Sequence, residues 1–266
     1  MSKPITAPRL REMKNEGRKI VMITAYDYPS ACIAEEAGVD VILVGDSLGM
    51  VVQGHHSTLP VTLEESLYHT RIVSRACSRT MVIGDMPFGT YHQSTAHAID
   101  AASRYMKEAG AHAVKLEGGA NVVEQIRALT RAQIPVCAHI GLTPQSIHVF
   151  GGFKVQRVTE KLLADAKAVQ DAGAMSVVIE CVTADIAKQI TAELEIPTIG
   201  IGAGVDCDGQ VLVWHDLLGL GDPSRKLPRF VKPYASLYGT IRDALVAYRD
   251  EVQGGTFPGP ANTYEP

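Results

Sequence analysis

The stretch AGVDVILVGDSLGM, residues 37–50, decides the fold. It begins with an Ala-Gly pair that follows a helical pattern, continues as a nearly continuous aliphatic run, and reaches a carboxylate at Asp46. Gly38 stands where a helix commonly ends in a left-handed conformation, and an aliphatic run without alternation is typical of a strand that is covered on both faces. A helix that leads in this way into a buried strand indicates a βα repeat.

The same joint between a helix and a strand occurs twice more, in KEAGAHAVK (107–115) and QDAGAMSVV (170–178). Around these joints, short β-rich runs alternate with helical stretches along the whole chain. We expect helices over 6–15, 63–78, 95–109 and 235–253. We expect strands over 19–27, 39–46, 80–87, 111–119, 134–141, 174–182, 196–204 and 209–216.

Eight strands with helices between them predict an α/β chain folded as a (β/α)8 TIM barrel, with an N-terminal helix before the barrel. A doubly wound open sheet is the alternative, but it requires a Gly-rich phosphate turn after the first strand, and ITAYDYPSA (23–31) has none. No linker is visible, so residues 1–266 are predicted to form one domain. Residues 1–18 are its helical lead-in, and residues 255–266 are a tail rich in Pro and Gly.

Two connections, 47–61 and 142–158, are longer than a turn requires. Each follows the C-terminal end of an expected strand, which is the face where barrel enzymes build their active sites. Long ordered loops in a compact domain are usually lids or binding segments.

Composition limits the partners. The net charge of −4 gives no electrostatic footprint for nucleic acid or for an anionic membrane. No apolar run approaches the roughly 18 residues that a membrane helix needs, and the N-terminus has no signal-peptide pattern. The five cysteines are widely spaced and form no C-x-x-C pair, which is typical of a reducing compartment. We expect a cytoplasmic protein.

Acidic side chains gather at the C-terminal ends of the expected strands. Asp46, Asp85 and Glu117 end three adjacent strands, which lie roughly 4.8 Å apart in a sheet. Like charges so close together repel each other unless protons or a cation intervene. Oxygen ligands without Cys or His suit Mg²⁺ better than Zn²⁺. The pattern therefore predicts a magnesium site, and separate salt-bridged carboxylates are the alternative.

Lys115 comes two residues before Glu117, so the period of two in a strand directs both side chains to the same face. A lysine inside a barrel is costly unless it meets an anion. One interpretation is a structural ion pair with Glu117, and the other is a cation for a substrate carboxylate beside the metal.

Glu180 ends the sixth strand, opposite Asp46 in a ring of eight strands. This position suits a general base that faces a metal-bound substrate without binding the metal. His139 ends the fifth strand and is a possible second-shell residue of the metal, or the next candidate for the base.

These residues carry a resemblance to a known family. The blocks VGDSLGMVVQGHHSTLPVT (44–62), DMPFGTY (85–91), VKLEGG (114–119) and HIGLTPQS (139–146) resemble the ketopantoate hydroxymethyltransferases, and the match runs in order from about residue 19 to 255. The resemblance implies transfer of a one-carbon unit from methylenetetrahydrofolate to 3-methyl-2-oxobutanoate, which gives ketopantoate in pantothenate biosynthesis through a Mg-stabilised enolate. It also implies a homo-oligomer, a decamer in bacterial members.

By position in the matching motifs, the resemblance assigns Mg²⁺ to Asp46, Asp85 and Glu117, and the proton acceptor to Glu180. It assigns contacts with the ketoacid to Ser47 and Lys115, together with Asp46 and Asp85. One alternative is a Mg-dependent 2-oxo acid lyase or mutase of the phosphoenolpyruvate mutase and isocitrate lyase type, but its K-K-C-G-H loop is absent from this sequence. A barrel that acts only as a binding or scaffold protein is the other alternative.

Overall fold

The computed structural model describes residues 3–224 and 226–265, and the chain divides into two compact units, Met1–Val213 and Trp214–Pro266. The first unit contains all the strands, and the second contains the last helices. The expectation of one domain over residues 1–266 stays a prediction.

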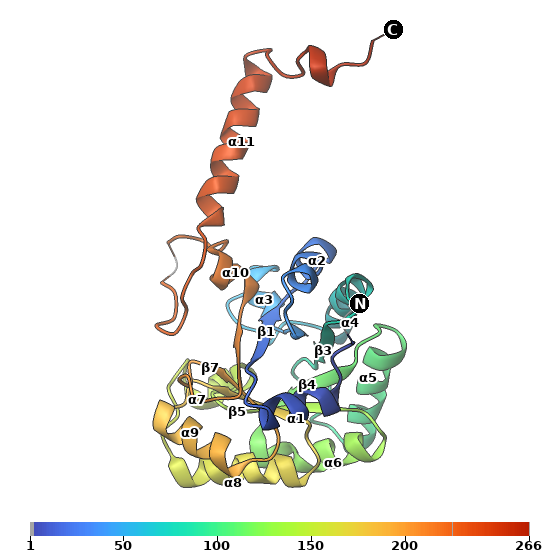
Figure 1. Ribbon diagram of the computed structural model, residues 1–266, viewed down its shortest axis with the longest axis vertical. Helices are drawn as coiled ribbons and strands as arrows, with labels where there is room; N and C mark the ends of the chain where they lie inside the picture. The colour runs from blue at the N-terminus through green and yellow to red at the C-terminus, as the bar shows by residue number, and fades with distance from the viewer. Residues whose placement is uncertain (1–2, 225, 266) are drawn as a thin grey trace. The chain divides into compact units, whose positions relative to one another are not determined.

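The strands of the first unit form a closed parallel barrel, in which each strand pairs with its neighbours in the chain and the first pairs with the eighth (Figure 1). The predicted (β/α)8 barrel is thereby confirmed. Each strand lies within its expected range and is shorter than that range. The strands are β1 (Ile20–Thr24), β2 (Val41–Val44), β3 (Met81–Asp85), β4 (Ala113–Glu117), β5 (Val136–Gly141), β6 (Ser176–Glu180), β7 (Thr198–Ile201) and β8 (Gly209–Leu212).

Helices precede the barrel and connect its strands, and α8 and α9 pack against each other on its outside (Figure 1). The α-helices of this unit are α1 (Ala7–Asn15), α2 (Tyr28–Glu36), α3 (Leu48–Val51), α4 (Leu63–Ala76), α5 (Thr95–Lys107), α6 (Val123–Arg131), α7 (Ile147–Phe150), α8 (Thr159–Asp171) and α9 (Ala184–Glu193). Two short 3₁₀ segments are η1 (Gly119–Val122) and η2 (Pro144–Ser146). The N-terminal helix before β1 is thus present, and the two long connections contain α3 and α7.

The helix ends follow the signals in the sequence. Thr62 and Glu65 cap α4 reciprocally: the Thr62 hydroxyl accepts a hydrogen bond from the Glu65 amide, and the Glu65 carboxylate accepts one from the Thr62 amide. Ser94 caps α5 through the amide of His97. The three Ala-Gly joints end in left-handed glycines, Gly38, Gly110 and Gly173.

Two apolar clusters lie on the two sides of the barrel wall. The outer cluster packs α4, α5, α6, α8 and α9 against the strands. The inner cluster fills the barrel and includes Leu10 and Met13 of α1, so α1 covers the N-terminal end of the barrel. Burying these side chains is the main stabilising contribution to the fold.

The inward face of the strands changes from apolar to charged toward their C-terminal ends. Along β3, Ile83 belongs to the inner cluster and Asp85 follows it at the two-residue spacing of a strand. Along β4, Ala113 precedes Lys115 and Glu117 in the same way. We call this C-terminal end the barrel mouth, and its ionisable side chains are Asp46, Asp85, Lys115, Glu117, His139 and Glu180.

The second unit contains α10 (Trp214–Leu218), α11 (Leu237–Gln253) and the 3₁₀ segment η3 (Pro260–Asn262). The expected eighth strand, 209–216, was too long, because β8 ends at Leu212 and His215 and Asp216 lie in α10. The run WHDLL has the apolar spacing of a helical turn, which explains this end. No residue of α11 is buried.

No helix within residues 3–224 and 226–265 is long and apolar enough to cross a membrane.

Candidate active site

Lys115 lies at the centre of the barrel mouth, between two carboxylates. The strand register places Asp85 of β3 beside Lys115 of β4. Lys115 Nζ donates to Asp85 Oδ1 at 2.7 Å and to Glu117 Oε1 at 3.1 Å. All three side chains are buried, with Lys115 only 3% exposed. An ion cluster so far from solvent forms only when its charges compensate each other, because each ion loses its hydration.

Asp46 reaches the same cluster from a turn. Strand β2 ends at Val44, and the Asp46 amide then donates to Asp85 Oδ2 at 3.0 Å. Gly45 leaves room for the Ser47 hydroxyl in its observed position, since a Cβ at residue 45 would lie 2.7 Å from Ser47 Oγ. The Ser47 hydroxyl is half-buried and shares a 2.8 Å hydrogen bond with the Tyr26 hydroxyl. The turn thereby brings both Asp46 and Ser47 to the mouth.

Gln145 connects two of the carboxylates and was not expected from the sequence. Its side-chain Nε2 donates to Asp46 Oδ2 at 2.9 Å and to the Met86 carbonyl at 3.0 Å. Its backbone amide donates to Glu117 Oε2 at 3.1 Å. The Tyr91 hydroxyl donates to Gln145 Oε1 at 2.5 Å, which fixes the orientation of the side-chain amide.

Each carboxylate therefore has one oxygen held by an N–H group of the protein. These oxygens are Oδ2 of Asp46, Oδ2 of Asp85 and Oε2 of Glu117. The second oxygens of Asp85 and Glu117 face the Lys115 ammonium. Fixing one oxygen of a carboxylate orients the other, which is how outer partners orient the ligands of a metal.

The acids of the mouth differ in their affinity for protons. Burial, together with the charges of Asp85 and Glu117, raises the pKa of Asp46 well above its ordinary value. Burial also raises the pKa of Asp85, although Lys115 opposes it. Burial alone would raise the pKa of Glu117, but Lys115 and His139 outweigh it and lower that pKa to about 2. Asp46 and Asp85 therefore hold a proton more tightly than Glu117 does, because the single Lys115 ammonium does not balance negative charge on all three carboxylates.

His139 lies between Glu117 and Glu180. Its Nδ1 is 3.3 Å from Glu117 Oε1, and its Nε2 is 3.4 Å from Glu180 Oε2. Neither contact has the alignment of a hydrogen bond, so both buried ring nitrogens lack a full hydrogen-bond partner. Burial lowers the pKa of His139, but the two carboxylates outweigh it and raise that pKa to about 9. The ring therefore lies between the central cluster and Glu180, where the two carboxylates favour its protonated form.

Glu180 is the most accessible acid of the mouth. Its side chain is 15% exposed, whereas those of Asp85 and Glu117 are 2% exposed. The strand register pairs Glu180 with Gly141 of β5, where a Cβ would lie 2.3 Å from the Glu180 carbonyl oxygen. Glu180 can thus meet a substrate that enters from solvent.

The carboxylates of the barrel mouth have the chemistry that Mg²⁺ requires of its ligands. In the part of the chain that the structure describes, no three Asp, Glu, His or Cys side chains already converge as a metal-binding group. The chemistry of the donors nevertheless fits a hard cation, because Asp46, Asp85 and Glu117 supply only oxygens. The Lys115 ammonium occupies a cation position between Asp85 Oδ1 and Glu117 Oε1. These three carboxylates could hold Mg²⁺.

All the site residues that the sequence suggested are at the barrel mouth, and their roles stay predictions. The sequence was enough to predict that residues two apart on a strand share one face, because side chains alternate between the two faces of a sheet. Gln145 and Tyr91 could not be found in this way, because both lie outside the strands and Gln145 is 99 positions from its partner Asp46. Two signals were available: the length of the 142–158 connection, and the motifs DMPFGTY (85–91) and HIGLTPQS (139–146), which contain Tyr91 and Gln145.

Solved structures with the same barrel fold include 2,3-dimethylmalate lyase and oxaloacetate acetylhydrolase in complex with oxalate. The lyase is 20% identical with a TM-score of 0.62, and the alignment covers 95% of this chain and 89% of that chain. The hydrolase is 16% identical with a TM-score of 0.65, and the alignment covers 99% and 92%. At these identities the likeness shows the fold alone.

Relatives with much higher identity share the whole chain. A 3-methyl-2-oxobutanoate hydroxymethyltransferase of Desulforapulum autotrophicum is 57% identical over 265 residues, covering 100% of both chains. One of Carboxydothermus hydrogenoformans is 54% identical over 264 residues, covering 98% of this chain and 95% of the relative. The ketopantoate hydroxymethyltransferase model matches residues 4–260. This chain belongs to the ketopantoate hydroxymethyltransferase family.

Proposed function

We propose that the barrel mouth is where this hydroxymethyltransferase converts 3-methyl-2-oxobutanoate to ketopantoate, in pantothenate biosynthesis. Methylenetetrahydrofolate is the one-carbon donor, and water supplies the oxygen of the new hydroxymethyl group. The lyase or mutase alternative is not retained, because the family and the relatives at 54–57% identity are hydroxymethyltransferases.

One observation carries the proposal of a magnesium-assisted site. Three buried carboxylates, on the turn after β2 and at the ends of β3 and β4, each have one oxygen fixed by a backbone or side-chain N–H group. Such an arrangement is costly for the fold alone, since the charges repel each other away from water. When bound to Asp46, Asp85 and Glu117, Mg²⁺ would supply Lewis-acid polarisation of the 2-oxo group of the ketoacid.

Lys115 and Ser47 are proposed to hold the ketoacid. The ammonium of Lys115 bonds only to carboxylate oxygens in the structure, so a substrate carboxylate is a partner of the same kind. The Ser47 hydroxyl, on the turn after β2, can donate a hydrogen bond while Tyr26 orients it. Both contacts would orient the substrate relative to Glu180.

Glu180 is proposed to take the proton from C3 of the ketoacid, which leaves the substrate as its enolate. A general base needs free lone pairs and access to the substrate, and Glu180 is the acid of the mouth with both. His139, 3.4 Å from Glu180, is proposed to orient that carboxylate and to connect it with Glu117. The enolate carbon then bonds to the methylene carbon of the donor as the bond from that carbon to one folate nitrogen breaks and this nitrogen takes a proton. Water displaces the second folate nitrogen, which gives the hydroxymethyl group and releases tetrahydrofolate.

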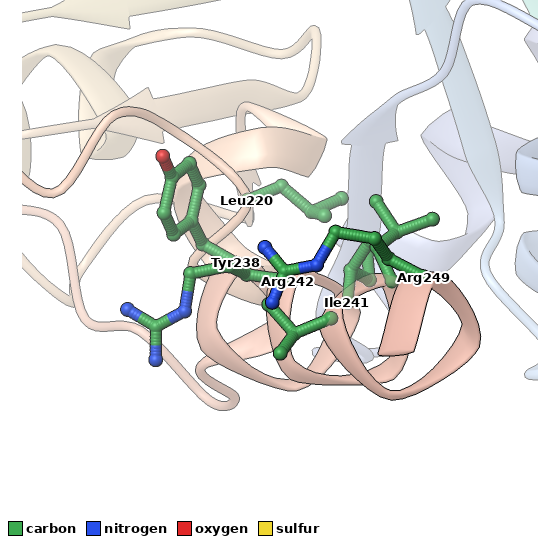
Figure 2. Close-up of a pocket in the computed structure, with 7 residues that line it drawn as sticks. Leu220, Tyr238, Ile241, Arg242 and Arg249 are labelled. Carbon is green, nitrogen blue, oxygen red and sulfur yellow. The ribbon is translucent and has the colours of Figure 1, made fainter. Parts of the chain in front are cut away.

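The chain is proposed to act as a homo-oligomer, a decamer by family resemblance, through α11. Its side chains Tyr238, Ile241, Leu245, Tyr248 and Val252 repeat at alternating spacings of three and four and are all exposed. Figure 2 shows several of them around a surface groove of about 470 Å³. Arg242 and Arg249 also line it, and adjacent aspartates neutralise both. Such an apolar stripe is typical of a helix that packs against another helix.

The cytoplasm is proposed as the compartment. All five cysteines are free in the structure, although the protein has enough of them for two disulfides. Unpaired thiols are usual where glutathione and thioredoxin keep cysteines reduced.

Turnover of 3-methyl-2-oxobutanoate with methylenetetrahydrofolate, with and without Mg²⁺, tests the function directly. Ketopantoate should form only when the ketoacid, the folate and the metal are all present. Equal turnover after exhaustive treatment with a chelator would contradict the metal site while leaving the reaction itself in place.

A further inference from the structure

The segment 142–156 is fixed at both ends beside Glu180. The Leu142 amide donates to the Glu180 carbonyl at 2.9 Å, and the Gln156 amide donates to the Cys181 carbonyl at 2.7 Å. Near its start, the segment sends Gln145 into the carboxylate cluster. A loop whose ends meet at consecutive residues is compact and frequently functional. The residues between these two anchors therefore stay at the same end of the barrel as the general base.

The outer part of this segment exposes apolar and aromatic side chains. Val149 is 88% exposed and Phe153 is 58% exposed, and Val155 also faces solvent. Gly151 and Gly152 lie between Val149 and Phe153. Their φ angles are +64° and +122°, values that only glycine adopts without strain. Apolar side chains gathered on one loop next to a reaction centre indicate a surface that contacts a partner or a ligand.

The same segment carries positive charge and no acidic residue. Residues 142–158 include His148, Lys154 and Arg157, whereas the whole chain has a net charge of −4. Within residues 3–224 and 226–265, neither Lys154 nor Arg157 has a carboxylate at ion-pair distance, although Arg157 is near enough to Asp185 to lower the pKa of that carboxyl. A ligand that fits this surface must combine a flat apolar part with negative charge.

We propose that residues 147–158 form the docking surface for the folate co-substrate. Its aromatic pterin would rest on Phe153 and Val155, and its glutamate carboxylates would pair with Lys154 and Arg157. This inference rests on the proposed function, because only a folate-dependent reaction needs such a ligand beside Glu180. The match is one of chemistry: rings favour aromatic and aliphatic surfaces, and carboxylates favour lysine and arginine.

The pterin contact and the glutamate contact can be tested separately. Phe153→Ala should raise the KM for methylenetetrahydrofolate about tenfold with both mono- and triglutamate forms, because the ring contact is common to them. Lys154→Glu should raise the KM mainly for the triglutamate form and abolish any preference of the parent for it. Lys167→Glu is the matched control for Lys154→Glu, since Lys167 is an exposed lysine on α8 in the same unit.

Deuterium exchange at C3 of the ketoacid, measured without folate, distinguishes the possible failures. The docking surface predicts that both variants exchange at the parental rate while their folate KM rises. An unchanged folate KM in both variants overturns the inference. So does a parallel loss of exchange, which would mean that the loop only positions Glu180. A variant that changes its oligomeric state but keeps the parental folate KM also overturns the inference, because the segment would then contact a second copy of the chain. A parent that neither exchanges nor turns over contradicts the proposed function instead.

Discussion

The barrel mouth and helix α11 place side chains in opposite environments. At the mouth, Asp46, Asp85, Lys115 and Glu117 are charged groups buried away from water. On α11, no residue is buried, and apolar side chains such as Leu245 face solvent. Each arrangement is unfavourable in the isolated chain, since buried charge loses hydration and exposed apolar surface orders water.

The difference shows what each region lacks. The mouth has oriented carboxylate oxygens and needs positive charge, so it fits a cation and an anionic substrate next to Lys115. Helix α11 has an exposed apolar stripe, and we propose a second copy of the chain as the surface that covers it. Substitutions in the mouth should therefore affect chemistry without affecting assembly, and substitutions on α11 should do the reverse.

The largest expected effect comes from Asp85→Asn. The substitution removes a proposed metal-binding oxygen and a partner of Lys115, while the side chain keeps its size. Turnover should fall by more than about 100-fold, beyond the 10–100-fold typical of an outer partner of a metal. Isothermal titration calorimetry with Mg²⁺ measures the weaker metal binding that we expect to cause this loss. If the variant binds Mg²⁺ as tightly as the parent does, the proposed cage is wrong.

Gln145→Met should have the next largest effect. The change removes the donors to Asp46 Oδ2 and to the Met86 carbonyl but keeps the backbone amide that holds Glu117. We expect a loss of about 10–100-fold in Mg²⁺ affinity, because Asp46 is no longer oriented. Tyr91→Phe is the matched variant: it keeps the Gln145 donors but loses the hydroxyl that orients the amide and also bonds the Glu117 backbone, and its loss should be smaller. If Gln145→Met binds Mg²⁺ as tightly as the parent does, Gln145 contributes only to packing.

Lys115→Met distinguishes a substrate contact from a structural ion pair. The ammonium is lost while the aliphatic stem remains, and Mg²⁺ at saturation supplies positive charge to the carboxylates. The KM for the ketoacid should rise about tenfold or more, as for a lost charge-assisted hydrogen bond, and the KM for the folate should change less. A ketoacid KM equal to that of the parent would leave only the ion pair with Asp85 and Glu117.

The smallest effect on chemistry is expected from α11. Leu245→Asp places a charge in the centre of the apolar stripe and should weaken assembly by roughly 30-fold, as for a hot-spot residue of an interface. Ala247→Asp on the same helix lies outside the groove and is the control. Sedimentation velocity measures the assembly, and deuterium exchange should stay within about twofold of the parent. Unchanged sedimentation in Leu245→Asp would exclude this face as an interface.

The sequence was sufficient to predict the barrel and most of the mouth, because strand periodicity is local. Lys115 and Glu117 share a face simply because they are two residues apart. Asp46 was expected at a strand end, but it reaches the site through a turn beyond Val44. Gln145 was missed since the path of an irregular loop depends on contacts that are distant in sequence.

The environment of α11 also could not be predicted from the sequence. Apolar residues at alternating spacings of three and four predict a helix with one buried face, and the helix was found over Leu237–Gln253. The pattern does not say what covers that face, because the same stripe serves a core or an interface. Its exposure became evident only in the structure.

The most direct measurement of the central claim is deuterium exchange at C3 of 3-methyl-2-oxobutanoate, in D₂O with Mg²⁺ and without folate. Glu180 is the accessible acid of the mouth, so Glu180→Gln should slow the exchange by about 10²–10⁴-fold. The same variant should still bind Mg²⁺ and the ketoacid, since the amide has nearly the size of the carboxylate. We expect rapid exchange in the parent and this loss in the variant. Exchange at the parental rate in Glu180→Gln would mean that Glu180 is not the base.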